Sequence, residues 1–433
     1  MNESILAPRR PENLMTNKRV AVIGGGPAGA LTSYLLAKQG VQVDIFEPRS
    51  TKKPNKLLGE KIPLCTGCAG LIQENTVDLL ESIGLTIPAN VIQAKLENNI
   101  IHFPDTSRTV TIPSKAVTVY RGFSPIKPTE GTNIESFDAW LLDEAIKAGA
   151  KQRLLKVNGI TKKDKIIKLT TKEGEFQADL IIGAYGHEGS IKINGLDPLE
   201  KPQTGKGCVR EYYLGDEVLE KLKNNKHVFG NPTSKIWFAG IFPKTDHVSI
   251  ALMGRTDVSQ NDFNEFLSLR EVKELLGNGI ISDKPTCGCT SPITIRSPSK
   301  FMAVNEMGEL IIINVGDAGP SRPRVNGIFS ALDEARKLVE TLSQYGTGQK
   351  AMKKYQSYME HQYIWDNYFA ERVLNTFDWI LNNSLPRDVV MSLAHSQIGL
   401  IRTLATNTMD YVISGKGPYW QLPLQVLEES LFN

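Results

Sequence analysis

Apolar positions along the chain follow two periods, and their order predicts an α/β fold. Short stretches rich in apolar residues occur within residues 18–23, 41–46, 179–186 and 309–315, and the first two are separated by a stretch that favours a helix. Continuous β-branched runs of this length are typical of buried parallel strands. This order of strand, helix and strand predicts a Rossmann-type domain.

The rest of the chain predicts two further parts. Residues 76–84 and 137–150 have the spacing of helices, whereas residues 91–119 alternate as strands do. Residues 205–290 predict a separate block of strands with one helix. Residues 327–413 predict a series of helices, two of which are separated at Pro386. The expected fold class is therefore α/β, with a Rossmann-type domain, a second domain built on a mixed β-sheet, and C-terminal helices.

A glycine motif between the first strand and the first helix carries the strongest chemical signal. Gly24 allows a tight turn, Gly26 lets the backbone approach a pyrophosphate, and Gly29 allows close packing of helix on strand. Pro27 and Ala28 lie between them, where N–H groups at the helix start can bind phosphate oxygens.

An acidic residue completes this motif. Glu47 ends the second apolar run, where a carboxylate accepts the ribose hydroxyls and repels a 2′-phosphate. Strand, glycines, helix, strand and acid in this order predict a dinucleotide-binding site.

Composition and charge exclude several classes of function. The formal charge is only +3 and no long basic block occurs, so we expect no nucleic-acid partner. No run of about 18 apolar residues predicts a transmembrane helix. Five cysteines are few for a secreted disulfide scaffold, and we expect a cytoplasmic protein. The sequence contains neither a Ser-His-Asp pattern nor a P-loop, so we expect neither hydrolase nor NTPase chemistry.

The motifs together resemble the flavin-dependent geranylgeranyl reductases, within the wider superfamily of aromatic hydroxylases and flavin-dependent halogenases. The resemblance covers most of residues 18–342. It rests on the glycine motif with Glu47, the Cys-Ala-Gly-Leu-Ile segment that begins at Cys68, Arg121 ahead of Phe137-Asp138, the strand after Asp179, the Phe238-Ala-Gly-Ile-Phe-Pro243 segment, and Gly316-Asp317.

This resemblance implies FAD as the cofactor. It places the Asp317 carboxylate, after Gly316, on the ribityl chain, and adds Arg121 to the FAD-binding residues. It also implies a division of the chain into a mobile N-terminal arm (1–17), a discontinuous FAD-binding domain (18–204 and 301–342), a substrate-binding domain (205–300) and a C-terminal helical region (343–433).

The substrate side follows from the same resemblance. Phe238, Ile241 and Phe242 are expected to face an elongated apolar cavity beside the flavin. The family carries a tryptophan where this chain has Gly240, so the cavity wall should be reshaped there. The expected substrate is an apolar small molecule.

The implied function is reduction of C=C bonds in a prenyl or other elongated apolar substrate, by hydride transfer from reduced flavin. A flavin-dependent monooxygenase or halogenase stays open as an alternative, as does a non-catalytic prenyl-binding relative. The electron donor would be external, either NAD(P)H or a ferredoxin-like protein. Tyr185-Gly186 stands where the family has Asp-Gly, a position associated with dinucleotide contacts in the hydroxylases, so NADPH use does not transfer directly.

The cysteines leave several interpretations open. Cys68 is the candidate catalytic residue, either as a proton donor or as a small spacer in the flavin pocket. The spacing of Cys65 and Cys68 with Cys287 and Cys289 would also suit a tetrathiolate metal site, although our prediction is that no metal binds.

Two further segments are ambiguous. Arg322 and Arg324, beside the expected flavin face, could hold an anionic group of the substrate or be solvated loop charges. The C-terminal aromatic stripe that includes Trp365, Phe369 and Phe377 is expected to be core. The alternative is a cover over a lipid-like substrate or a peripheral membrane contact.

Overall fold

The structure is a computed structural model that describes residues 14–49, 67–103, 108–123, 135–163, 166–187, 191–254, 256–277 and 287–424. Predictions on Cys65 and on the arm before residue 14 lie outside these residues. The end of the expected mobile arm is ordered, because residues 14–17 form a turn and Met15 is fully buried in the core.

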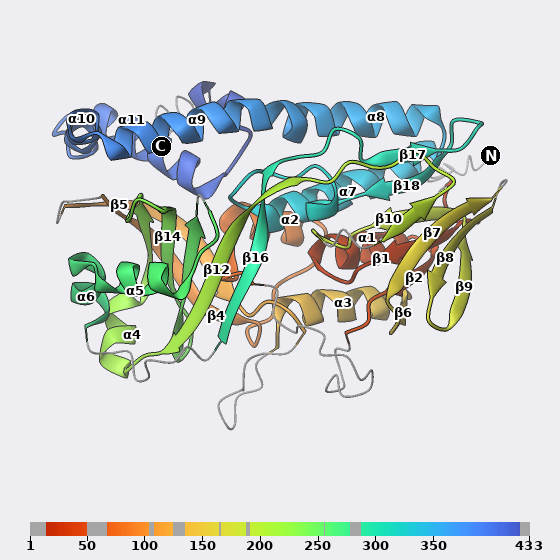
Figure 1. Cartoon of the computed structure of the whole chain (residues 1–433), viewed down its shortest axis with the longest axis horizontal. Helices are drawn as coiled ribbons and strands as arrows, with labels where there is room; N and C mark the ends of the chain where they lie inside the picture. Colours follow the sequence, from red (N-terminus) through yellow and green to blue (C-terminus); the bar gives the residue numbers. More distant parts are fainter. Residues whose placement is uncertain are drawn as a thin grey trace, which may run out of the picture.

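A six-stranded sheet forms the predicted Rossmann-type domain (Figure 1). Its first two strands, β1 and β2, are joined by helix α1, and all pairs except β17 with β18 are parallel. In sheet order the strands are β17 (Met302–Val304), β18 (Leu310–Asn314), β10 (Leu180–Gly183), β1 (Arg19–Ile23), β2 (Gln42–Phe46) and β6 (Lys151–Arg153).

Helices pack on this sheet, and a small sheet lies beside it. Residues of α1 (Pro27–Lys38), α3 (Phe137–Lys147) and α7 (Gly327–Tyr345) share one hydrophobic core with β1, β2 and β10. In the small sheet, most strand pairs are antiparallel. Its strands are β11 (Lys192–Asn194), β7 (Val157–Lys163), β8 (Ile166–Thr171) and β9 (Gly174–Ala178).

An eight-stranded mixed sheet forms the second part of the molecule. One face packs on three short helices, α4 (Asp216–Leu222), α5 (Gln260–Ser268) and α6 (Arg270–Leu276). In sheet order the strands are β16 (Cys287–Arg296), β12 (Gln203–Tyr213), β15 (His247–Gly254), β14 (Ile236–Pro243), β13 (Asn224–Gly230), β4 (Ile92–His102), β5 (Thr109–Val119) and β3 (Leu71–Gln73).

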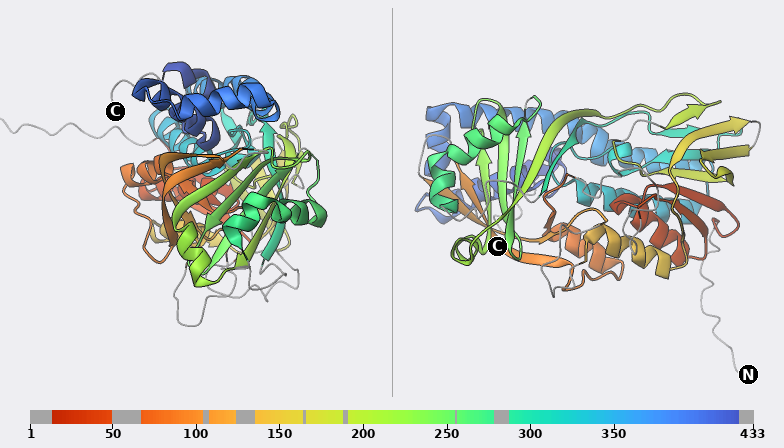
Figure 2. Two further views of the ribbon diagram at one scale, coloured as in Figure 1. Left: turned by 90° about the vertical axis from the view of Figure 1, so that its left-hand side faces the viewer. Right: turned by 60° about the horizontal axis from the view of Figure 1, so that its bottom comes forward.

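The C-terminal helices form a separate layer (Figures 1 and 2). Helix α8 (Gln349–Met359), a π-helical turn (Glu360–Ile364) and α9 (Trp365–Asn382) follow one another without a break, and α10 (Ser384–Ala394) and α11 (Gly399–Ser414) fold back against them. No helix in the described part of the chain is long and apolar enough to span a bilayer.

Three sequence expectations need correction. Strands β3, β4 and β5 lie inside the segment 18–204, yet they complete the eight-stranded sheet, so residue 204 does not separate the two sheets. The block after residue 205 contains three helices and not one. Pro386 does not separate two helices, because the break is at Asn383 and Pro386 lies in the first turn of α10, where a proline is tolerated.

Candidate cofactor and substrate site

The glycine turn after β1 has the geometry that its three glycines require. Gly24 has φ +105°, and a Cβ there would lie 2.3 Å from the carbonyl oxygen of Ala184. A Cβ on Gly29 would lie 2.0 Å from the carbonyl oxygen of Gly24, whereas one on Gly26 would meet nothing within 4 Å. Gly24 and Gly29 are therefore required by the fold, while Gly26 faces open space at the start of α1, where a pyrophosphate would fit.

Glu47 lies directly after β2, beside this turn. Its carboxylate is almost fully buried and accepts the backbone N–H of Gly25 at 2.8 Å. Arg49, which the sequence analysis did not single out, donates two guanidinium bonds to the same carboxylate at 2.8 and 2.9 Å. The Arg49 guanidinium also lies over the Phe123 ring, 4.3 Å from its centroid. Ribose hydroxyls would share the Glu47 carboxylate with Arg49.

We expect Glu47→Ala to weaken FAD binding by about 10- to 100-fold, because it removes an acceptor of charged hydrogen bonds. The Kd for FAD is measured by flavin fluorescence on the apoprotein. Asp44→Asn is the control, since Asp44 lies on β2, just before Glu47, but pairs with Arg153 at the surface. A full flavin complement in Glu47→Ala after extensive dialysis would contradict the assignment.

The second predicted cofactor segment packs against the first. Gly316 has φ +62°, and a Cβ there would lie 3.0 Å from Cβ of Ala28 in the first turn of α1. Its N–H donates to Oε2 of Glu334 at 2.8 Å. Burial raises the pKa of Glu334 well above its usual value, and the neighbouring Asp317 adds to the shift. The half-exposed Asp317 thus lies at the junction of α1 and α7.

His187 lies beside this carboxylate. Its Nδ1 is 3.8 Å from Oδ2 of Asp317, and its Nε2 is 2.9 Å from Oγ1 of Thr294. The structure thus brings His187 to the carboxylate predicted to bind the ribityl chain.

Cys68 and Arg121, which lie far apart in the sequence, meet in a buried cluster. Arg121 forms a two-point ion pair with Asp138, at 2.8 and 3.1 Å, and its remaining nitrogen lies 3.4 Å from Sγ of Cys68. Burial lowers the pKa of Arg121, but Asp138, Cys68 and Asp317 together raise it by more, so the net shift is upward. The backbone N–H of Gly70 also points to this sulfur, at 3.4 Å. The ion pair with Asp138 therefore fixes the orientation of the Arg121 guanidinium. In the sequence, Asp138 stood out only as part of the Phe137-Asp138 motif.

The predicted substrate residues on β14 divide between two faces of the sheet. Ile241 is fully buried against α5 and α6, in a cluster that includes Phe263 and Phe266. Phe242 lies on the opposite face with Ala69 and Val209. The expectation that Ile241 faces the same cavity as Phe242 is therefore wrong, because neighbouring residues of a strand point to opposite faces.

Gly240 does not leave open space in the wall. A Cβ on Gly240 would lie 2.2 Å from Cζ of Phe242, so the Phe242 ring already covers the position where the family has a tryptophan. The Phe242 ring, two positions further along the same face, therefore occupies the space beside Gly240.

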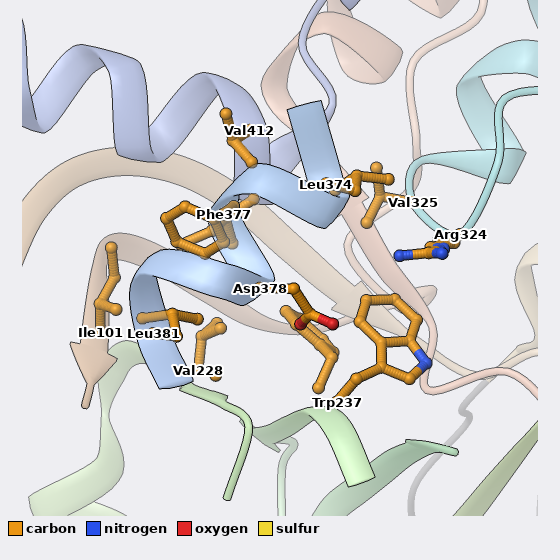
Figure 3. Close-up of a pocket in the computed structure, with 13 residues that line it drawn as sticks. Ile101, Val228, Trp237, Arg324, Val325, Leu374, Phe377, Asp378, Leu381 and Val412 are labelled. Atoms are coloured by element: carbon orange, nitrogen blue, oxygen red, sulfur yellow. The ribbon is translucent and has the colours of Figure 1, made fainter. Parts of the chain in front are cut away.

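An apolar pocket lies between the eight-stranded sheet and the C-terminal helices (Figure 3). The space free of protein atoms between its walls is about 480 Å³, a figure that includes open solvent. Arg324 and Trp237 lie at one end, and Ile101 and Leu381 at the other (Figure 3). The walls are formed by Ile101, Val228, Gly230, Trp237, Phe238, Arg324, Val325, Leu374, Phe377, Asp378, Leu381, Val412 and Ile413.

Comparisons with known proteins identify the cofactor. Residues 17–194 match the family described as FAD binding domain. A digeranylgeranylglycerophospholipid reductase from Methanocaldococcus jannaschii is 24% identical over 273 residues, which cover 61% of this chain and 61% of that protein. Residues 17–194 of this chain therefore form an FAD-binding domain, and the match spans about three fifths of that reductase.

Solved structures share the fold of the whole chain. A geranylgeranyl bacteriochlorophyll reductase-like protein from Thermoplasma acidophilum superposes with a TM-score of 0.63 at 16% identity, over 95% of this chain and 99% of the other. A flavin-dependent halogenase superposes with a TM-score of 0.59 at 17% identity, over 96% of this chain and 77% of the other. These likenesses confirm the predicted fold class.

The two loop arginines have different surroundings. Arg322 is buried, donates to the carbonyl oxygen of Gly415 and lies over the Phe329 ring at 5.3 Å, so it joins the α7 loop to the end of α11. It is neither a solvated charge nor open to a substrate. Arg324 lies 4.7 Å from the Trp237 ring at the end of the pocket, where an anionic substrate group could reach it.

The described cysteines give no support for a metal site. Among the described residues, no group of three His, Cys, Asp or Glu side chains could hold a metal ion. Cys68 and Cys208 are free thiols, and Cys289 is disulfide-bonded. Cys65 and the side chain of Cys287 lie outside the described residues.

Proposed function

We propose that this chain is an FAD-dependent oxidoreductase that reduces C=C bonds of a prenyl or other elongated apolar substrate. The observation that carries the proposal is the position of the apolar pocket. The loop that follows Asp317 forms the end of this pocket where Arg324 lies. Ser321 of that loop contacts Asp317 at 3.4 Å, while Arg324 and Val325 line the pocket. A chain held there would reach from the cofactor segments to the C-terminal helices. The polyprenyl lipid reductase among its relatives supports the same substrate class.

FAD, when bound and reduced, supplies a hydride. The protein must orient the alkene, exclude water and deliver a proton. Apolar side chains from β14 and from α9 would orient the substrate and exclude water. For the proton, we propose Cys68: two N–H donors point at its sulfur, which fixes the sulfur and leaves the S–H free to point elsewhere. An external donor, NAD(P)H or a ferredoxin-like protein, would reduce the flavin.

Cys68→Ser tests the proton-donor role, because serine keeps the size of cysteine but is a far weaker acid. We expect the oxidation of reduced enzyme by substrate to slow by about 100-fold, with flavin reduction unchanged. Stopped-flow absorbance measures both steps. Cys208→Ser is the matched control, since Cys208 is also a free thiol but packs on the α4–α6 side of the sheet. An unchanged rate in Cys68→Ser would reduce Cys68 to a spacer.

The reaction class itself is tested without oxygen. Reduced enzyme is mixed with polyprenyl diphosphates or polyprenyl lipids, and flavin absorbance and product mass are followed. Reoxidation with a gain of two hydrogens per double bond supports the proposal. The halogenase-like fold keeps oxygen chemistry as the second candidate. Substrate oxidation or halogenation only when oxygen is supplied, with no anaerobic turnover, would favour that candidate.

A further inference from the structure

The long C-terminal helix α9 exposes large aromatic side chains to solvent. Trp365, Phe369 and Trp379 are 61, 43 and 58% exposed, and their spacing places them on one side of the helix. The sequence analysis expected Trp365 and Phe369 in the core, and this expectation is wrong. Bulky aromatic residues in a row on a solvent-facing helix are unusual for a surface that contacts only water.

Helix α10 is apolar on both sides. Met391 and Ala394 are buried in a cluster with strands β4 and β5, as is usual for a packed helix. On the outward side, Leu385, Val389 and Leu393 recur every four residues and are 77, 52 and 42% exposed. A surface helix normally exposes polar residues, whereas these exposed positions of α10 are apolar.

The same apolar character continues into the next helix. Ile398 and Leu400, at the start of α11, are 60 and 50% exposed. We define the apolar helical face as Trp365, Phe369, Trp379, Leu385, Val389, Leu393, Ile398 and Leu400. The three helices that carry it lie in the outer layer of the molecule (Figure 1).

Exposed charged residues of the C-terminal helices α8 to α11 are mainly basic, although Lys350, Lys353 and Lys354 lie on α8, outside this face. Between residues 349 and 409, the exposed acidic residues are Glu371 and Asp388, and Glu371 is paired with Arg296 at 3.3 Å. The exposed basic residues of the same stretch are Lys350, Lys353, Lys354, Arg372 and Arg402. This excess of basic charge is complementary to an anionic surface and would oppose the packing of two copies face to face.

We propose that the apolar helical face binds the surface of a lipid bilayer that contains anionic lipid. Tryptophan is favoured at membrane interfaces, and basic residues add attraction to anionic headgroups. Helices α9 and α11 also form part of the wall of the apolar pocket, through Leu374, Phe377 and Val412. Bilayer binding goes beyond the proposed reaction, and it is measured without turnover, so either proposal can fail alone.

The test is co-sedimentation of the full-length FAD-loaded protein with phosphatidylcholine vesicles, prepared with and without phosphatidylglycerol. We expect binding to vesicles that contain phosphatidylglycerol, and weaker binding to pure phosphatidylcholine. The triple variant Leu385→Gln, Val389→Gln and Leu393→Gln should lower the partition coefficient by at least about 10-fold, because each residue loses its burial in the interface.

Met307→Gln is the matched control, since Met307 is 61% exposed in the turn after β17, outside the apolar helical face. Flavin absorbance and thermal unfolding check the fold of each variant, and Leu385→Gln alone replaces the triple variant if that one does not fold. Protein that stays in the supernatant with both vesicles overturns the proposal. So does equal binding of the triple variant. A wild-type dimer that the triple variant converts to monomer would instead assign the face to a second copy of the chain.

Discussion

Gly26→Ala is expected to lower the affinity for FAD by about 100-fold, close to 2.7 kcal/mol, while the apoprotein stays folded. A Cβ at this position meets no protein atom within 4 Å, so the substitution costs the fold little. The added methyl group would occupy the space at the start of α1 where the pyrophosphate must approach the backbone. Titration of apoprotein with FAD gives the affinity, and thermal unfolding of the apoprotein gives the stability.

Gly29→Ala provides the contrast for this experiment. Its Cβ would lie 2.0 Å from a backbone oxygen, so α1 would have to move away from β1. We expect the apoprotein itself to lose stability, in contrast to Gly26→Ala. If both variants were equally destabilised as apoproteins, the distinction between a glycine needed by the ligand and one needed by the fold would not hold.

Asp138→Ala is expected to reduce the free energy of unfolding by about 3 to 5 kcal/mol. Asp138 is fully buried and its side chain accepts bonds from the Arg121 guanidinium and from the N–H of Gly122 at 2.6 Å. Removal of the carboxylate leaves a buried guanidinium without its counter-charge, and this cost exceeds that of a lost neutral hydrogen bond. Urea unfolding of the apoprotein measures the change.

A double variant separates the lost ion pair from lost packing. Arg121→Met with Asp138→Leu removes both charges and fills the space with apolar atoms, so it should be more stable than Asp138→Ala by about 2 kcal/mol or more. The same variant should release Cys68 from its contact with Arg121. Equal loss of stability in the single and double variants would show that packing, and not an uncompensated charge, dominates at this site.

The cofactor half of the site could be predicted from sequence because its signals are local. The glycines, β1, α1 and β2 lie within about 30 consecutive residues, and each residue type has a steric or electrostatic reason that needs no knowledge of the rest of the fold. Asp138 was not recognised as the partner of Arg121 because an aspartate in the first turn of a helix has an ordinary local explanation, favourable interaction with the helix dipole.

The substrate half could not be predicted to the same depth, for two physical reasons. Strand β4 pairs with β13 across more than a hundred residues of sequence, and no local pattern encodes such a partner. Both faces of β14 are covered, so its residues show no alternation of polar and apolar types that would tell which face meets the cavity. Ile241 and Phe242 are therefore equivalent in sequence but separated in the structure.

The position of β18 between β17 and β10 also governs when the nascent chain can fold. About 130 residues separate β10 from β18 in sequence, and ribosomes need on the order of 10 s to add them. During this interval the edge of β10 that pairs with β18 is unpaired, and the face of α1 that packs on Gly316 and α7 is uncovered. Such an edge invites pairing with other chains, so protection by a chaperone would matter most then. A fragment that ends at residue 194 would keep this edge exposed permanently.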